Sequence, residues 1–396
     1  MRRILILSVL VLATLAAAAA TADETSAPVV MTLADAVALA TGATPAVQLA
    51  SLRTHEAQAR RTQALAALLP SLSGSAFVMD RTYAFRAMGF PLGNIPGIHI
   101  PDLIGPVNQV DARLRATQAL FDAASWMRWR SAGQGVGVSR AEQGGTTEAA
   151  AQSAALAYVR MARAEAVREA RTADLELARQ LTGLAEDQLK AGTAARIDVT
   201  RARTQEATAR GALLVAGTQP DRATIDLART LGLDPVTRFH LGDSLALSLG
   251  RGAETAAGVS SEAPGEAAAA VALAMARRPD LTAERTRFER ARNEGRAIQA
   301  ERLPRFDVSA ELGLSNDYWP GAERVRSATL AVSMPIFDGM RREARAAEQG
   351  AVAREADVRR RDLEQQITAE VRGALLDVSS GIEQEGVALE RLRLAQ

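Results

Sequence analysis

At 396 residues, the chain is long enough for two ordinary domains or for one large domain built from repeats. Its 47 lysines and arginines nearly balance its 46 aspartates and glutamates, and a net charge of +1 excludes a strong field for attracting nucleic acid. It contains no cysteine, which excludes disulfides, thiol catalysis, a cysteine-ligated zinc and a lipid-modified N-terminal cysteine.

The N-terminal segment is typical of a secretory signal peptide. Arg2 and Arg3 precede an apolar run over 4–15, and the sequence Ala-Thr-Ala follows at 20–22. The unbroken apolar run is shorter than the ~20 residues that a membrane-spanning helix needs, which favours cleavage over an uncleaved anchor. We expect residues 1–22 to be removed and the mature chain to leave the cytoplasm.

The first half of the mature chain, residues 23–232, combines long helices with one pair of strands. Thr32 is predicted to cap a short helix over 32–41, because Asp35 stands at its third position. Glycines weaken the start of the predicted helix 123–190, each by up to ~1 kcal/mol relative to alanine. We therefore expect close helix packing or a local break there. The main elements predicted for this half are helix 45–69, strands 71–81 and 110–121, and helices 123–190 and 198–231.

A turn is predicted between the two long helices of this half. Gly192 suits the end of the first helix, and Asp198 is predicted to be the N-cap of the helix that returns. The first long helix would span ~100 Å and the returning helix ~51 Å. A connector over 233–265 follows, with a short strand predicted at 239–249 and then a linker rich in glycine, alanine and serine.

The second half, residues 266–396, repeats the plan of the first. Pro45 and Pro70 recur at the same spacing as Pro279 and Pro304, and Phe-Asp follows both strand pairs, at 121–122 and 337–338. The predicted elements of this half are helix 266–303, strands 305–316 and 325–336, and long helix 339–396.

By the spacing of the repeat, the second turn and return helix would fall beyond position 396. The sequence therefore predicts that the return helix of the second repeat is missing. Either the sequence is an incomplete product, or the absence leaves an unfilled slot in the wall that the repeats build.

The four predicted strands have the length of tilted membrane-crossing strands, 9–11 residues. In 110–121 one face is mostly apolar and the other charged, as Val110, Ala112 and Leu114 alternate with Asp111 and Arg113. Membrane barrels carry aromatic girdles at both interfaces, and the aromatic residues near these strand ends are Tyr83, Phe85, Trp126, Trp129, Tyr318 and Trp319. The alternative is a soluble sheet packed on its apolar face, and the pattern alone does not separate the two.

The membrane interpretation requires an oligomer. Four strands cannot close a barrel, and an open sheet edge is not tolerated in lipid, so several subunits would have to pool their strands.

No catalytic, cofactor-binding or metal-binding residue is predicted. The glycines at 133–137 lack the buried strand that precedes a dinucleotide-binding loop, and neither a phosphate-loop lysine motif nor a Gly-x-Ser-x-Gly elbow occurs. The histidines lie far apart in sequence, and the acidic residues are spread over helix faces with arginines. We therefore expect that the protein is not an enzyme.

The chain resembles the TolC-like outer-membrane efflux protein family over nearly all of its mature length. The resemblance depends on the order and duplication of short motifs: "LADAVALATGATPAV" and "AVALAMARRPDL", Leu-Pro before each strand pair, "ALFDA" and "PIFDG" after them, and "LKAGTAARIDVTRA" at the helical turn. It implies a mainly α fold with a membrane β-barrel, in which two tandem repeats build a homotrimeric channel-tunnel across the outer membrane and periplasm.

The resemblance also implies a function and partners. The protein would be an exit duct for efflux or type I secretion, coupled to an inner-membrane pump through a periplasmic adaptor. The tip residues that would contact the adaptor are Gly192, Thr193, Arg196, Ile197 and Asp198. The alternatives are a periplasmic coiled-coil adaptor or scaffold, which the two strand pairs disfavour, and an incomplete duct that does not assemble.

Overall fold

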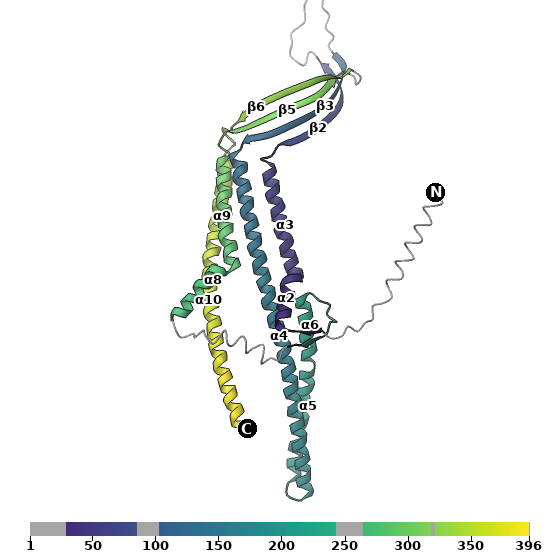
Figure 1. The fold of residues 1–396 in the computed structure, drawn as a ribbon, viewed down its shortest axis with the longest axis vertical. Helices are drawn as coiled ribbons and strands as arrows, with labels where there is room; N and C mark the ends of the chain where they lie inside the picture. The colour runs from purple at the N-terminus through teal and green to yellow at the C-terminus, as the bar shows by residue number, and fades with distance from the viewer. Residues whose placement is uncertain (1–28, 85–102, 243–263, 318–320, 396) are drawn as a thin grey trace, which may run out of the picture. The chain divides into compact units, whose positions relative to one another are not determined.

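The structure is a computed structural model that describes residues 29–84, 103–242, 264–317 and 321–395 (Figure 1). The predicted signal peptide, Phe85, Tyr318 and Trp319 lie outside the described residues. The chain divides into two compact units. The sheet unit contains Ala50–Gly145 and Ala267–Asp377, and the tip unit contains Met1–Leu49, Thr146–Glu266 and Val378–Gln396.

The sheet unit contains one four-stranded sheet in the order β2-β3-β5-β6, with every neighbouring pair antiparallel. Two strands are longer than the sequence predicts, because backbone pairing continues from Arg81 and Val107 to Ala84 and Leu103 despite the glycine and proline between them. β6 ends before Pro335, which has no backbone N–H to donate. The strands are β2 (Ser71–Ala84), β3 (Leu103–Phe121), β5 (Arg305–Asn316) and β6 (Glu323–Ser333).

The predicted helix 266–303 is wrong in one respect, because the structure divides it into two helices. Arg278 has φ −65° and ψ 123°, since a residue before proline avoids the helical region, and Pro279 begins the second helix. The other connections between helices and the sheet are each made by a single helix. The helices of this part of the chain are α3 (Pro45–Ala66), α4 (Ala123–Lys190), α8 (Pro264–Arg277), α9 (Pro279–Ala300) and α10 (Arg341–Ala395).

Several helix ends differ from the sequence prediction by one to three residues, as at Ala300, where α9 ends instead of at 303, and two of the differences have a clear local cause. α3 stops at Ala66 instead of 69, because the next residues form tighter turns in which the N–H of Leu68 donates to the carbonyl of Leu65. α10 begins at Arg341 instead of 339, because Met340 has a positive φ of 65° that a right-handed helix excludes.

The glycines near the start of α4 allow close packing, and the helix continues through them without a break. A methyl group on Gly135 would lie 3.7 Å from the Arg290 guanidinium, and one on Gly144 would lie 3.6 Å from the Pro279 ring. The expected close approach of neighbouring helices is therefore confirmed at these positions, and the expected local break does not occur.

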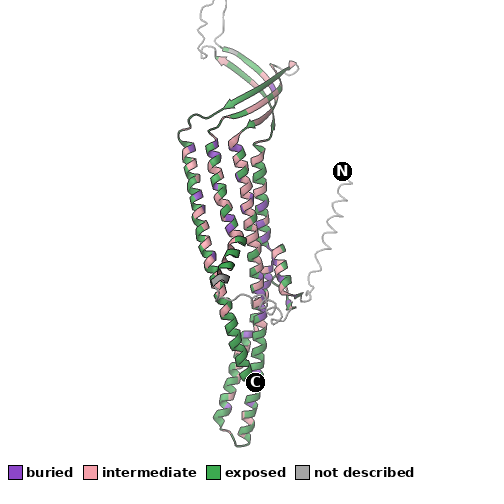
Figure 2. Cartoon of the chain, turned by 60° about the vertical axis from the view of Figure 1, so that its left-hand side comes forward, coloured by how far each residue is buried: buried purple, intermediate pink, exposed green. Residues whose placement is uncertain are grey.

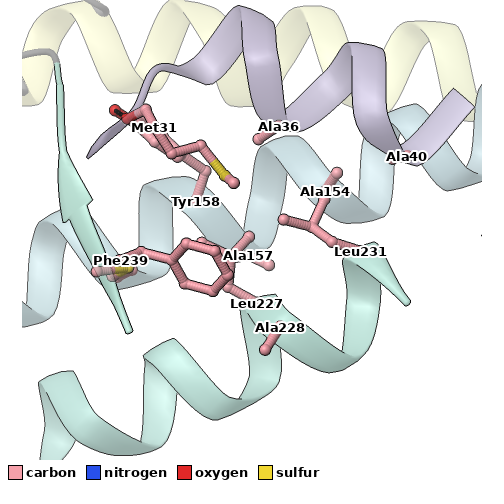
Figure 3. Close-up of a cluster of buried hydrophobic side chains, with 11 residues drawn as sticks. Met31, Ala36, Ala40, Ala154, Ala157, Tyr158, Leu227, Ala228, Leu231 and Phe239 are labelled. Atoms are coloured by element: carbon pink, nitrogen blue, oxygen red, sulfur yellow. Dashed lines mark hydrogen bonds between the residues drawn. The ribbon is translucent and has the colours of Figure 1, made fainter. Parts of the chain in front are cut away.

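The tip unit has a small apolar core beneath a two-stranded parallel sheet of β1 (Val29–Met31) and β4 (Phe239–Leu241). Figure 3 shows Tyr158 from α4 against Met31, and the Tyr158 hydroxyl donates to the Met31 carbonyl over 3.2 Å. The core residues are Met31, Ala36, Ala40, Ala154, Ala157, Tyr158, Met161, Leu227, Ala228, Leu231 and Phe239.

Three further helices belong to the described residues of the tip unit. α2 (Leu33–Ala43) begins with the predicted cap, since Thr32 and Asp35 form both hydrogen bonds of a capping box. The predicted helix 198–231 is two helices, α5 (Arg196–Gly217) and α6 (Gln219–Leu231), because Pro220 at the second position of α6 starts a new helix. Of the predicted strand 239–249, Phe239–Leu241 is a strand and residues 243–249 lie outside the described residues.

Candidate membrane sheet and helical tip

One face of the four-stranded sheet is apolar and exposed. Leu114 of β3 lies between Gly74 and Leu312 in the ladder, so these positions share a face. Leu312 is 63% exposed and Val78 is 78% exposed, and Figure 2 shows few buried residues on the strands. We call this the apolar face, and its large apolar residues include Leu72, Val78, Val110, Leu114, Val308, Leu312, Leu314, Leu330 and Val332. Arg326 and Arg324 of β6 lie on the same face, opposite Leu312 and Leu314.

The opposite face of the sheet, the polar face, is rich in hydroxyl groups and holds an ion-pair network. Asp111 is 1% exposed and accepts two hydrogen bonds from Arg113, at 2.7 Å and 2.8 Å. Glu311 of β5 lies 3.5 Å from Arg113 and also pairs with Arg115. The hydroxyl residues on this face are Ser71, Ser73, Ser75, Thr117, Ser309, Ser315, Ser327, Thr329 and Ser333.

This network depends on a glycine that sequence reasoning did not identify. Gly313 lies opposite Arg113 in the ladder, and a methyl group on it would lie 2.8 Å from both the Ala112 carbonyl oxygen and Arg113 Cγ. The network also joins β3 to β5, the two central strands. The only sign of this network in the sequence is the alternation of charged residues after Val110. That alternation predicts that the strand has a polar face, but it does not predict which strand pairs with it.

The sheet has two edges that the described residues do not pair. β2 and β6 are the outer strands, and each has one neighbour in the ladder. An unpaired strand edge presents free backbone N–H and C=O groups that can pair with another strand. The sheet is therefore open among the described residues.

Arginine side chains stack on the three interface aromatic residues that the structure describes. The Arg61 guanidinium lies 5.3 Å from the Trp129 ring centre, and that of Arg130 lies 6.0 Å from the Trp126 ring centre. Tyr83, near the loop end of β2, is covered in the same way by Arg81, at 5.0 Å. Sequence reasoning identified the rings but not these cations.

The junction from β3 to α4 is held by Asp122. One carboxylate oxygen accepts from the Ser125 backbone N–H at 2.9 Å, and the other accepts from the Ser125 hydroxyl at 2.7 Å. Arg305, at the start of β5, lies 3.5 Å from the same carboxylate. This aspartate is the acidic residue of the first Phe-Asp pair, and it fixes where α4 leaves the sheet.

The turn between α4 and α5 has the geometry of a helix C-cap. Gly192 has φ 75°, its N–H donates to the Leu189 carbonyl, and the Thr193 N–H donates to the Gln188 carbonyl. These two hydrogen bonds form a Schellman motif, which satisfies carbonyls that the end of α4 would otherwise leave free.

The predicted N-cap at Asp198 is wrong by three residues. The N-cap of α5 is Ala195, and Asp198 is the third helical residue. Its carboxylate accepts from the Ala195 N–H at 3.1 Å, so it completes the carboxylate half of a capping box while alanine offers no side-chain oxygen.

Exposed side chains surround this turn. Gly192, Thr193, Arg196, Ile197 and Asp198 are all exposed, and Ile197 is 55% exposed. The Thr193 hydroxyl donates to the Gln188 carbonyl, while the Arg196 side chain has no ion pair among the described residues. The structure therefore brings all five predicted tip residues together at one helical turn.

The described residues include one stretch with the length and composition of a membrane-spanning helix and no candidate metal site. One described stretch, Leu33–Ala66, is long and apolar enough to cross a membrane by length and composition. It is two helices separated at Thr44, and Ala36 and Ala40 of the first helix are packed in the core. In the described part of the chain, no group of three or more metal-ligating side chains is placed to hold an ion.

Comparison with known structures shows the fold. The chain is similar to the CmeC outer membrane channel of Campylobacter jejuni, with a TM-score of 0.70 and 14% identity over 90% of this chain and 73% of that chain. It is similar to VceC of Vibrio cholerae, with a TM-score of 0.71 and 19% identity over 92% and 83%. For the MtrE outer membrane channel of Neisseria gonorrhoeae the TM-score is 0.64, with 16% identity over 91% and 75%.

Sequence comparison shows the family. No match is found among curated proteins. The family model for outer membrane efflux proteins matches residues 36–233 and 270–396, which is most of the chain and includes both strand pairs. The chain therefore belongs to the outer membrane efflux protein family and is an outer-membrane protein with a TolC-like fold.

Proposed function

We propose that the protein is a passive exit duct, in which three copies pool their sheets into a twelve-stranded barrel across the outer membrane. The observation that supports this most directly is a sheet with an exposed apolar face, a polar face and two unpaired edges. Four strands cannot close a barrel in lipid, so the proposed duct needs other copies to cover β2 and β6.

The dimensions of the apolar face fit a membrane. From Val110 to Leu120, β3 would extend ~34 Å at ~3.4 Å per residue, which is ~25 Å across a membrane at a tilt of ~40°. Lipid-facing bands of outer-membrane barrels are ~25 Å tall. The polar face, with its hydroxyls and its ion-pair network, would line the water-filled interior.

The helical part would lie in the periplasm, where two tandem repeats would build the wall of a tube. The helical turn at Gly192, Thr193, Arg196, Ile197 and Asp198 would meet a periplasmic adaptor that couples the duct to an inner-membrane pump. Exposure of all five residues and the rigid hydrogen-bonded turn support this role. No cofactor takes part in this proposal, since transport through a duct needs none.

A substitution on the apolar face distinguishes this duct from a soluble sheet. Leu330→Arg should reduce outer-membrane insertion strongly, because a cation added to the lipid face costs up to about 2–4 kcal/mol. Ser327→Arg, on the polar face of the same strand, is the matched control and should insert normally. The readouts are membrane fractionation and the heat-modifiable oligomer on gels. Equal insertion of both variants would contradict the proposed lipid face.

A further inference from the structure

The start of α4 and the end of α3 carry a patch of two tryptophans and two arginines. We call Arg61, Trp126, Trp129 and Arg130 the Trp–Arg patch. Trp126 is 47% exposed, and both arginines are exposed. Each guanidinium lies over one indole ring, as described above, and both cation–π contacts are within the ~6 Å at which such contacts are attractive.

The two arginines of the patch form no ion pair among the described residues, whereas other arginines nearby do. Arg60 pairs with Glu56 at 2.5 Å, and Arg128 pairs with Glu301. Neither Arg61 nor Arg130 has a carboxylate within ion-pair distance in the described ranges. A planar guanidinium fixed against a ring, with its donors free, matches the geometry of a phosphate oxygen pair.

The position of the patch fits the headgroup layer, if the sheet spans the membrane as proposed. Trp126 and Arg130 lie three and seven residues after Ala123, or ~5 Å and ~10 Å along α4. The headgroup layer on each side of a bilayer is ~5–8 Å thick. Side chains of a helix tilt towards its N-terminus, which for α4 is the end that joins the sheet, so Arg130 and Trp126 lean towards the membrane. α3 reaches the sheet with its C-terminal end, so Arg61 is placed in the patch by its contact with the Trp129 ring and not by this tilt.

We propose that Arg61 and Arg130 bind the phosphate groups of phospholipids in the membrane leaflet next to the helices. This inference depends on the proposed membrane-spanning sheet and adds a ligand that holds the helices at the bilayer surface. The overall net charge of +1 gives no general attraction to anionic lipid, so binding has to come from this local pair of guanidinium groups. The tryptophans fix the guanidinium planes and occupy the interface themselves.

Lipid binding to the purified protein tests this site. The protein is extracted in detergent, stripped of lipid, and titrated with phosphatidylglycerol or with diacylglycerol of the same acyl chains, with adducts measured by native mass spectrometry. We expect the wild type to bind phosphatidylglycerol and not diacylglycerol. Arg61→Gln/Arg130→Gln should weaken phosphatidylglycerol binding about tenfold or more, since two charge-assisted contacts are lost.

The matched control is Arg210→Gln, which removes an exposed α5 arginine that has no ion pair among the described residues. It should bind phosphatidylglycerol like the wild type, and the two single variants Arg61→Gln and Arg130→Gln should each give an intermediate loss. Unchanged binding by the double variant, or equal loss in Arg210→Gln, would overturn the site. Loss of the oligomer with unchanged lipid per subunit would show instead that the patch joins copies of the chain.

Failure of the duct proposal gives a different result. In that case the wild type itself would give no heat-modifiable oligomer and would bind no phosphatidylglycerol. If only the lipid site is wrong, the wild type stays in the outer membrane, and its lipid binding is insensitive to Arg61 and Arg130.

Discussion

Gly313 shows how one residue determines the join between the two central strands. It leaves room for Arg113 to lie across β5, where the guanidinium reaches both Asp111 and Glu311. The acidic partners are then shielded by arginines, and Asp111 has no exposed side-chain area. A buried charge without its partner is costly, so the network requires the space that the glycine provides.

A methyl group at this position should disrupt the sheet. Gly313→Ala would place a carbon 2.8 Å from the Ala112 carbonyl oxygen, so β3 and β5 would have to separate or the arginine would have to move. We expect destabilisation of about 1–3 kcal/mol, seen as a lower melting temperature of the heat-modifiable oligomer.

The control for this prediction is another strand glycine. Gly74→Ala, in β2, places its methyl 4.0 Å from Leu114 Cδ1 and in otherwise open space, so it should leave the melting temperature unchanged or raise it. Equal melting temperatures for the two variants would contradict the role assigned to Gly313.

At the scale of elements, α9 and α10 are held together by an arginine at the start of α9. Arg278 donates to Asp280 at 2.7 Å and also pairs with Glu370 of α10. The hydrogen bond from Arg278 lowers the pKa of Glu370 below its usual range. Burial alone would raise the pKa of Asp280, but hydrogen bonds from Arg278 and the Leu281 backbone lower it.

Stability from this contact should depend on pH. Carboxylates with lowered pKa values stabilise the folded state above their unfolded pKa of ~4, and the contribution is lost as pH falls through the lower folded pKa. Arg278→Gln should therefore lower the free energy of unfolding by about 1 kcal/mol near pH 7. The loss is small because solvent screens these partly exposed charges. The difference in melting temperature between Arg278→Gln and the wild type should shrink below pH ~4. An equal difference at pH 7 and below pH ~4 would contradict the role given to the pairing of Arg278 with Asp280 and Glu370.

Elements with a simple local cause were predictable from the sequence, while contacts between distant segments were not. The alternation around Val110 predicts a strand with one apolar face, and the Thr32 cap follows from its spacing to Asp35. The break at Pro279 was missed because the helical pattern continues on both sides of it. The pairing of Arg278 with Glu370 crosses most of the second half, and nothing local encodes it.

The candidate site was predictable to a similar degree. The position of the tip turn could be predicted from a glycine and an aspartate close together in the sequence. The N-cap residue could not, because Asp198 accepts its hydrogen bond from the third helical position and the N-cap is Ala195. The tryptophans follow from their place after the strands, while the arginines stacked on them come from other turns or another helix. Turns and helix caps depend on residues that are close in the sequence, whereas side-chain contacts can join residues that are far apart in it.

For the whole molecule, the proposed coupling to an adaptor can be tested at the helical turn. A photo-cross-linking amino acid at Ile197, in cells of the native host, should give a covalent adduct with a periplasmic adaptor, identified by mass spectrometry. Leu214 is the control, because it is 70% exposed on the same helix but lies about 25 Å further along it. Adducts with the adaptor at position 214 and none at 197 would contradict the proposed contact.

The central claim is that copies of the chain close a barrel by pairing β2 of one subunit with β6 of the next. The natural sequence has no cysteine, so introduced cysteines report only on each other. The most direct measurement is disulfide cross-linking of Ser73→Cys in β2 with Ser327→Cys, Thr329→Cys or Ser333→Cys in β6, in outer membranes. At least one pair should give cross-linked dimers and trimers, as strand neighbours within ~7 Å can be bridged. Monomers alone for every pair, with the protein in the membrane, would contradict the shared barrel.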